Sequence, residues 1–289
     1  MRKTIYTLQG EYPGTKLRGE EKYKKLYHYT SFDSFVRIWL SKTLKFSPLP
    51  NVNDIQEAES SFSAYNINWL PVLAAYKDVR LSYKQISFTM DYDSYFKGCM
   101  SPMMWGLYAD KRKGVCLELD FEKLQLTENC IAHPIMYKKI LRKNQKIDPN
   151  VQTKKQVRDY IKKNKLDIFF TKHKCWEGEN EYRIVSDKDD FLNIQDAISA
   201  VYLTSCCSTE CLLVEKMVNG AVPVKYLKYF ATIDNMALPA LFDTQSSREE
   251  NERAMSNPDN ALLQWGNKID DFYSQHREDE DFPLYLKIL

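Results

Sequence analysis

The chain has 289 residues, of which 44% are hydrophobic and 13% aromatic, so it is long enough to bury a substantial core. It contains no run of about 18 apolar residues, and its N-terminus leads into polar sequence, which predicts neither a membrane span nor a signal peptide. Its seven cysteines show neither paired zinc-ligand spacing nor a disulfide framework. We therefore expect a cytoplasmic globular protein with no membrane partner.

The net charge of +2 conceals two segments of opposite sign. Residues 138–174 contain thirteen basic residues and three aspartates, a local charge of +10. Residues 243–281 contain eleven acidic and four basic residues, a local charge of −7. The basic segment predicts either a nucleic-acid or protein target, or an internal contact with the acidic segment. Two solvated helical faces are the simpler alternative.

The first predicted elements lie between residues 26 and 54. Residues 26–29 have the pattern of a strand, and Thr30 is the expected cap of a helix with an apolar face. Residues 44–47 alternate as in a second strand. A turn-rich loop then leads into a helix with Asn53 or Asp54 as its cap.

The middle of the chain continues to mix the two patterns. Residues 85–89 and 114–119 predict strands, and residues 103–108 predict an aromatic helix. Residues 151–170 predict one long helix, because apolar residues recur at helical spacing while lysines fill most other positions.

The last predicted elements are a helix over residues 209–218 and an acidic helical region over residues 246–275. Strands are expected at residues 182–185, 200–203 and 224–231. This mixture predicts an α+β fold with mixed, mainly antiparallel central sheets, flanking helices and a C-terminal helical segment. We expect a single α+β domain over residues 1–240 and an acidic helical extension over residues 241–289.

A Glu-x-Glu-x-Arg pattern is the most informative local feature. If it lies in a strand, the period of two puts Glu179, Glu181 and Arg183 on one face. Two neighbouring carboxylates repel each other unless Arg183 or a cationic ligand compensates them. Such a pair would suit the stabilisation of positive charge developing on a sugar. A solvated edge strand is the alternative interpretation.

Several separated motifs occur in a defined order along the chain. They are Leu-Tyr-His-Tyr-Thr-Ser at 26–31, Leu-Lys-Phe-Ser-Pro at 44–48, Asn-Asp at 53–54, Ile-Ser-Phe-Thr at 86–89, Met-Trp-Gly-Leu-Tyr at 104–108, Gly-Val-Cys at 114–116 and Lys-x-Trp-x-x-Glu-x-Glu-x-Arg from Lys174. Together they resemble the bacterial family catalogued as domain of unknown function 2971, over residues 26–203. The name of that family implies no activity.

The layout is also similar to that of ADP-ribosyltransferases, which carry His or Arg on a first strand, Ser-Thr-Ser or Tyr on a second, and Glu or Glu-x-Glu on a third. This resemblance implies an ADP-ribosyltransferase-like fold and NAD as the substrate. It assigns the first place to His28, the second to Ser87 and Thr89, and the catalytic third to Glu181 with Glu179 as its companion. The chain departs from the family in having Ser-Phe-Thr at the second place.

The resemblance gives each residue a role in cleaving the bond between nicotinamide and ribose. Glu181 would stabilise an oxocarbenium-like state and hold the ribose 2′-hydroxyl. Glu179 would orient a nucleophile or raise its partner's pKa. His28 and Ser87 would bind ribose hydroxyls or the nicotinamide amide.

The remaining candidates are expected to contact NAD or to belong to the core. Tyr29, Trp105 and Tyr108 could stack on a flat ring, although a Trp and a Tyr three positions apart on a helix are more often core residues. Thr30, Thr89 and Arg183 complete the predicted NAD-binding set.

Other chemistry has less support in the sequence. His173 and Cys175 lack partners at zinc-like spacing, so we expect no metal. Asn53 and Asp54 with Glu57 fit a helix cap better than a second catalytic acid. No P-loop, Gly-x-Gly-x-x-Gly or Gly-x-Ser-x-Gly motif occurs, which argues against Walker-type, Rossmann and hydrolase-elbow sites.

The resemblance to ADP-ribosyltransferases therefore implies an NAD-consuming ADP-ribosyltransferase-like or NAD glycohydrolase enzyme, of the kind found among toxin-like or phage-defence effectors. One alternative is a non-catalytic module that binds a nucleotide or a nucleic acid, with affinity supplied by residues 138–174. Another is a Mg²⁺-dependent nuclease that uses Glu179, Glu181 and Asp54.

Overall fold

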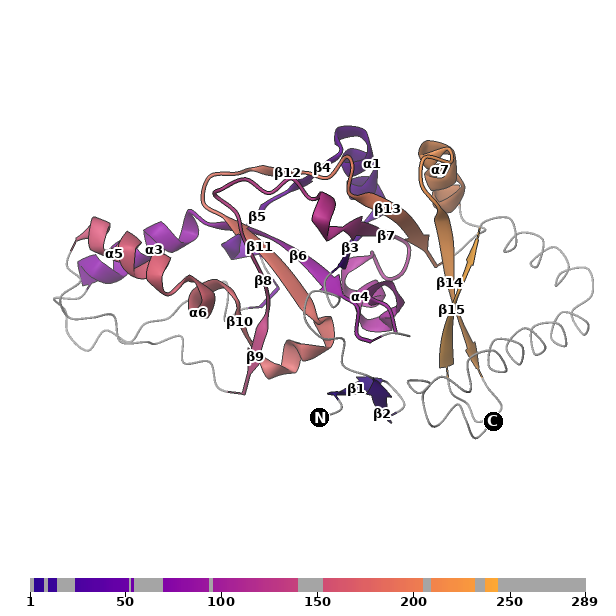
Figure 1. The fold of residues 1–289 in the computed structure, drawn as a ribbon, viewed down its shortest axis with the longest axis horizontal. Coiled ribbons are helices and arrows are strands. Elements are labelled where there is room, and N and C mark those ends of the chain that lie inside the picture. The colour runs from indigo at the N-terminus through magenta and orange to yellow at the C-terminus, as the bar shows by residue number, and fades with distance from the viewer. Residues whose placement is uncertain are drawn as a thin grey trace, which may run out of the picture. The chain divides into compact units, whose positions relative to one another are not determined.

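In the computed structural model of the protein, the described residues are 3–7, 10–14, 24–51, 53–54, 70–93, 96–139, 153–204, 209–231 and 237–243 (Figure 1). The chain divides into two compact units. The first consists of residues 1–40, 90–123 and 196–289, and the second of residues 41–89 and 124–195. In both units mainly antiparallel strands are combined with helices, so the predicted α+β class is confirmed.

The sheet of the first unit has the strand order β15-β14-β13-β7-β3 (Figure 1). Its strands are β3 (Lys25–Thr30), β7 (Val115–Asp120), β13 (Ile198–Leu203), β14 (Val224–Ala231) and β15 (Ala237–Asp243). Neighbouring strands are antiparallel except β13 and β14, which are parallel. Parallel neighbours cannot be joined by a tight turn, and here the helix α7 (Thr209–Val218) lies in the connection between them. The strands β1 (Lys3–Thr7) and β2 (Gly10–Gly14) form a separate antiparallel pair.

Two helices and two 3-10 turns complete the described part of the first unit. They are α1 (Phe32–Ser41), α4 (Pro102–Tyr108), η4 (Gly98–Met100) and η5 (Phe121–Lys123). The predicted cap of α1 at Thr30 is wrong, because Thr30 is the last residue of β3. Ser31 takes that role: its hydroxyl accepts from the Ser34 amide at 3.3 Å, and its carbonyl accepts from the Phe35 amide at 2.9 Å.

Gly114 lies where the chain packs tightly at the entry to β7. A Cβ at this position would lie 2.1 Å from the Thr30 carbonyl oxygen and 3.0 Å from Ala109 backbone atoms. Gly114→Ala should therefore lower the free energy of unfolding by about 1–3 kcal/mol, because backbone cannot move aside as a side chain can. Urea denaturation measures this effect. Gly106→Ala is the matched control: with nothing within 4 Å of its Cβ, this change on α4 should be neutral or stabilise by about 0.5–1 kcal/mol. Equal effects of the two changes would contradict the packing at Gly114.

The strands of the second unit form three groups. β8 (Ile131–Pro134), β11 (Glu181–Ser186) and β6 (Lys84–Met90) are neighbours in that order, and β5 (Ser47–Pro48) pairs with β6. β4 (Thr43–Lys45) pairs with β12 (Phe191–Asn193), and β9 (Met136–Lys138) pairs in parallel with β10 (Thr171–His173). Because β11 has antiparallel partners on both sides and all six of its residues are buried, its interpretation as a solvated edge strand is wrong.

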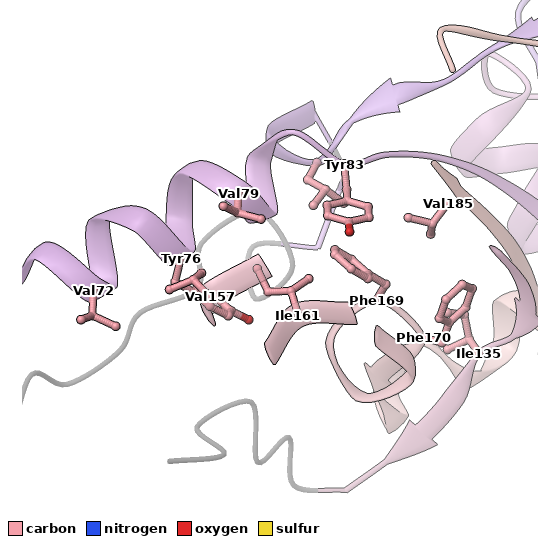
Figure 2. Close-up of a cluster of buried hydrophobic side chains, with 11 residues drawn as sticks. Val72, Tyr76, Val79, Tyr83, Ile135, Val157, Ile161, Phe169, Phe170 and Val185 are labelled. Carbon is pink, nitrogen blue, oxygen red and sulfur yellow. The ribbon is translucent and has the colours of Figure 1, made fainter. Parts of the chain in front are cut away.

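The second unit also contains the helices α3 (Leu70–Leu81), α5 (Lys154–Lys163) and α6 (Lys165–Phe169), and the 3-10 turns η2 (Leu49–Asn51) and η6 (Lys174–Glu179). Figure 2 shows how Val72, Tyr76 and Val79 of α3 face Val157 and Ile161 of α5. The same buried cluster continues through Phe169 and Phe170 to Val185 of β11. The hydrophobic core thus holds the end of α6 against the strand that carries Glu181.

The predicted single helix over residues 151–170 is wrong, because the chain breaks at Asn164 into α5 and α6. The Asn164 side-chain amide donates to the Tyr160 carbonyl at 2.8 Å, and its backbone amide donates to the same oxygen at 3.0 Å. Asparagine competes with the helical backbone in this way. At the other end of α5, Thr153 and Gln156 form a capping box.

The predicted strand at residues 44–47 is two short strands, β4 and β5, which are separated by Phe46 and pair with different partners. The other predicted elements that fall within the described residues are confirmed, with bounds that differ by at most a few residues. β14 and α7 have the predicted bounds. The expected helix after Asn53 and Asp54, Glu57, residues 140–152 of the basic segment and residues 244–289 of the acidic extension lie outside the described residues. None of the helices within the described ranges has the length and apolar character needed to cross a membrane.

Candidate functional site

The two glutamates of the Glu-x-Glu-x-Arg pattern lie on different backbone elements. Glu179 is the last residue of η6, Asn180 is left-handed with φ of 46°, and Glu181 is the first residue of β11. Asparagine adopts this conformation more readily than most residues. The predicted placement of Glu179 on the strand face is therefore wrong. Both glutamates are nonetheless 3% exposed, and both reach the same lysine.

Glu181 and Arg183 form a buried bidentate ion pair. Their positions two residues apart put both side chains on one face of β11. Arg183 Nε donates to Glu181 Oε1 at 2.8 Å, and Arg183 Nη2 donates to Glu181 Oε2 at 2.9 Å. The third guanidinium nitrogen, Nη1, donates to the Phe169 carbonyl at the end of α6 at 2.7 Å. The pair is therefore fixed to the hydrophobic core as well as to the strand.

The neighbouring strand β6 adds two hydroxyl groups to this face. Ser87 is opposite Arg183 in the β6–β11 register, and its Oγ donates to Glu181 Oε1 at 2.6 Å. Ser87 is exposed, so solvent reaches the edge of the buried carboxylate here. Thr89 is opposite Glu181 and fully buried. Among the described residues, its hydroxyl oxygen has no hydrogen-bond partner.

Lys172 of β10 joins the two carboxylates. Its Nζ lies 2.5 Å from Glu179 Oε2 and 3.4 Å from Glu181 Oε2. It also lies 4.6 Å from the ring centroid of Trp176, which is partly exposed. Lysine is rarely buried unless its charge is paired, and Lys172 is only 5% exposed. Two acids and two bases thus form one compact buried cluster.

This environment keeps Glu181 ionised. Burial alone would raise its pKa, but the charges of Arg183 and Lys172 and the hydrogen bonds from Arg183 and Ser87 outweigh burial and lower the pKa from 4.5 to about 2. The Glu181 backbone amide donates to the Tyr137 hydroxyl at 2.9 Å. Burial, followed by the charge of Glu181, raises the pKa of that tyrosine well above its ordinary value.

The four acceptor positions of the Glu181 carboxylate are unequally occupied. Oε1 accepts from Arg183 at 2.8 Å and from Ser87 at 2.6 Å. Oε2 accepts from Arg183 at 2.9 Å, whereas Lys172 approaches it only to 3.4 Å. That distance exceeds the usual range of about 2.7–3.2 Å for a nitrogen donor. Oε2 is therefore the atom at which a further donor, such as a ligand hydroxyl, would compete most easily.

The remaining predicted site residues lie in the first unit. His28, Tyr29 and Thr30 belong to β3, with His28 opposite Leu117 of β7. The Tyr29 hydroxyl donates to the Gly98 carbonyl at 2.6 Å, and its ring meets that of Trp105 edge-on at 5.2 Å. The predicted convergence of the His28 imidazole with the two glutamates stays a prediction.

The aromatic residues predicted to stack on a ligand belong to α4. Trp105 is 1% exposed, and its indole nitrogen donates to the Cys99 carbonyl at 2.7 Å. Tyr108 packs against the same buried cluster of the first unit. These contacts are those of core residues, which is the alternative that their spacing allowed.

Sequence reasoning missed Lys172, Trp176 and Tyr137. Lys172 was one of thirteen basic residues between 138 and 174, and no local pattern distinguishes it from its exposed neighbours. The sequence does mark Trp176, because this residue lies inside the Lys-x-Trp-x-x-Glu motif. Tyr137 is not marked, because its contact with Glu181 joins positions 44 residues apart.

The basic segment is partly neutralised by local acids. Lys138 pairs with Asp167 at 3.1 Å, Lys154 with Asp78 at 2.6 Å, and Lys174 with Glu177 at 3.8 Å. The described part of the chain contains no group of three or more His, Cys, Asp and Glu side chains placed to hold a metal ion. Within the described ranges, the cations that contact the two glutamates include the Lys172 ammonium and the Arg183 guanidinium.

The chain has a partial match to a known family. No curated protein and no solved structure matches it. Residues 104–184 match the family described as "Protein of unknown function (DUF2971)". The matched segment includes Lys172, Trp176, Glu179, Glu181 and Arg183. The predicted resemblance to this family is thereby confirmed over residues 104–184.

Proposed function

We propose that the protein is an NAD-consuming enzyme, either an ADP-ribosyltransferase-like transferase or an NAD glycohydrolase, with Glu181 as its catalytic carboxylate. The observation that carries the proposal is the state of Glu181. It is buried, its pKa is lowered to about 2, and one acceptor position on Oε2 faces only a long 3.4 Å contact with Lys172. A second carboxylate, that of Glu179, is joined to it through the same ammonium.

This arrangement matches the electrostatic demand of cleaving the nicotinamide–ribose bond. Nicotinamide leaves with the bonding electron pair, and positive charge develops on the anomeric carbon and the ring oxygen of the ribose. A fixed negative charge in buried surroundings stabilises that charge more strongly than the same carboxylate would in water. The pre-existing contacts with Arg183 and Ser87 hold the carboxylate in place, so little reorganisation is needed during the reaction.

Glu179 has a complementary role in the proposed reaction. The group that attacks the anomeric carbon, water or an acceptor nucleophile, must lose a proton as the new bond forms. The Glu179 carboxylate would accept that proton; it lies at the end of η6, whereas Glu181 begins β11. The NAD contacts predicted for His28, Tyr29 and Thr30 stay predictions from the resemblance, whereas Trp105 and Tyr108 have the contacts of core residues.

The proposal is tested by incubating the full-length protein with NAD and measuring released nicotinamide by chromatography. Glu181→Gln should release it about 10²-fold more slowly, the usual size of effect when a group that stabilises transition-state charge is lost. Glu177→Gln is the matched control: Glu177 lies in η6, its side chain is 38% exposed, and it pairs only loosely with Lys174 at 3.8 Å. This control should keep wild-type activity.

A second variant separates chemistry from folding. Glu181→Asp keeps the charge next to Arg183 but withdraws the carboxylate by one methylene group, so it should fold and yet release nicotinamide more slowly. Circular dichroism and the melting temperature of each variant establish that it is folded. Undiminished nicotinamide release by folded Glu181→Gln would remove Glu181 from the catalytic role, and a wild type that releases none would remove the proposed activity.

A further inference from the structure

The surroundings of Lys172 have the composition of a binding site for an organic cation. The ammonium lies between the carboxylates of Glu179 and Glu181 and 4.6 Å from the ring centroid of Trp176. Carboxylates and an aromatic ring face are the groups by which proteins bind cationic ligands. Three different elements, β10, η6 and β11, supply these side chains, so the arrangement is not a by-product of one local sequence.

The Lys172 ammonium supplies positive charge next to both glutamates. Arg183 compensates Glu181 through two hydrogen bonds, whereas Lys172 makes its shortest contact, 2.5 Å, with Glu179. Removal of the Lys172 charge would make this buried cluster more negative by one unit, and a more negative buried site favours any cation that can enter.

Two further observations point to a ligand at this place. The fully buried Thr89 hydroxyl lies on the same face as Glu181, and its oxygen has no hydrogen-bond partner among the described residues. Buried hydroxyl groups are normally paired, so this one is available to a polar group of a ligand. Ser87 is exposed and Trp176 partly exposed, so the cluster adjoins solvent on the side of these two residues.

We propose that the Lys172 ammonium fills, in the ligand-free protein, a site that can bind a planar organic cation. When the lysine side chain turns away, the cation stacks on Trp176 and faces Glu179 and Glu181, and its polar substituent pairs with Thr89. Pyridinium carboxamide, the cationic ring of oxidised nicotinamide nucleotides, combines these properties. That identification rests on the proposed function, whereas the cation site itself rests only on the geometry of the cluster. The site would favour oxidised over reduced nicotinamide, because reduction removes the charge of the ring.

The test compares a cation with a neutral ligand of nearly the same shape. Isothermal titration of the full-length protein would use 1-methylnicotinamide, which is cationic, and nicotinamide, which is neutral. Lys172→Met removes the internal competitor at similar volume and should bind 1-methylnicotinamide about ten-fold more tightly than the wild type does, without a matching gain for nicotinamide. Lys172→Arg keeps a cation in place and should bind as the wild type does. Lys138→Met, at an exposed ion pair with Asp167, should also be unchanged.

Equal affinity of the wild type and Lys172→Met for 1-methylnicotinamide would overturn the proposal. If Lys172→Met does not fold in plain buffer, it is refolded with either 1-methylnicotinamide chloride or potassium chloride at equal concentration. Recovery with the organic cation alone supports the site, and failure to recover contradicts it. This binding assay is independent of turnover, so tight cation binding without nicotinamide release would remove only the proposed function. If the wild type releases nicotinamide from NAD but Lys172→Met gains no affinity for 1-methylnicotinamide, only the cation site is contradicted.

Discussion

Arg183→Met should lower the free energy of unfolding by about 3–5 kcal/mol, because Glu181 would remain buried without its bidentate partner. Arg183 is 2% exposed, and its guanidinium donates to both carboxylate oxygens of Glu181 and to the Phe169 carbonyl. The change would therefore leave three acceptor atoms in buried surroundings without this donor. Urea denaturation at pH 7 measures the loss.

Two controls separate the ion pair from the loss of a large side chain. Arg158→Met, at an exposed position on α5, should change stability by less than about 0.5 kcal/mol. In the double variant Glu181→Leu/Arg183→Met both charges are absent, and much of the lost stability should return. Two results would contradict the energetic role inferred for the buried pair. One is an equal loss of unfolding free energy in Arg183→Met and Arg158→Met. The other is a loss in the double variant that exceeds the sum of the losses in Glu181→Leu and Arg183→Met.

The stability of the wild type should fall steeply in acid because Glu181 must be protonated there. Its pKa is lowered from 4.5 to about 2, mainly by Arg183 and Lys172 against the opposing effect of burial. A carboxylate with a lowered pKa stabilises the folded state above its unfolded pKa and loses that contribution as the pH falls through its folded pKa. The contribution is on the order of 3 kcal/mol at neutral pH, and it should disappear between about pH 5 and pH 2.

Glu181→Gln isolates this contribution, because the amide does not titrate. At pH 7 the wild type should be the more stable protein, and the difference between the two should narrow as the pH falls from 5 towards 2. Urea denaturation at several pH values, with unchanged secondary structure confirmed by circular dichroism, gives both curves. Parallel curves across this interval would show that the carboxylate is not held ionised by its neighbours.

The parts of the fold that depend on local periodicity were predictable from the sequence. β14 and α7 have the predicted bounds, because each is a continuous pattern that ends at a clear change of composition. The helix that was predicted too long shows the limit of this reasoning. Apolar residues keep their spacing across Asn164, but its backbone leaves helical geometry at φ −106° and ψ 17°, and its side-chain amide donates to the Tyr160 carbonyl.

The candidate site was predictable only in part. The Glu181–Arg183 pair follows from positions two apart on one strand, and Ser87 was assigned by resemblance. The position of Glu179 was not predictable, because it depends on the left-handed backbone of Asn180, which breaks the strand pattern. Lys172 could not be distinguished from the other lysines, because its burial depends on the parallel pairing of β9 with β10 and on the return of the chain through η6.

The interleaving of the two units limits how the protein can be divided. The chain passes from one unit to the other at residues 40/41, 89/90, 123/124 and 195/196, so neither unit is a contiguous stretch of sequence. The segment that matches the family, residues 104–184, begins within the first unit and ends within the second. A truncation designed on that segment alone would sever both units and expose apolar core from each. Fragment cloning or domain exchange must therefore keep the two units together.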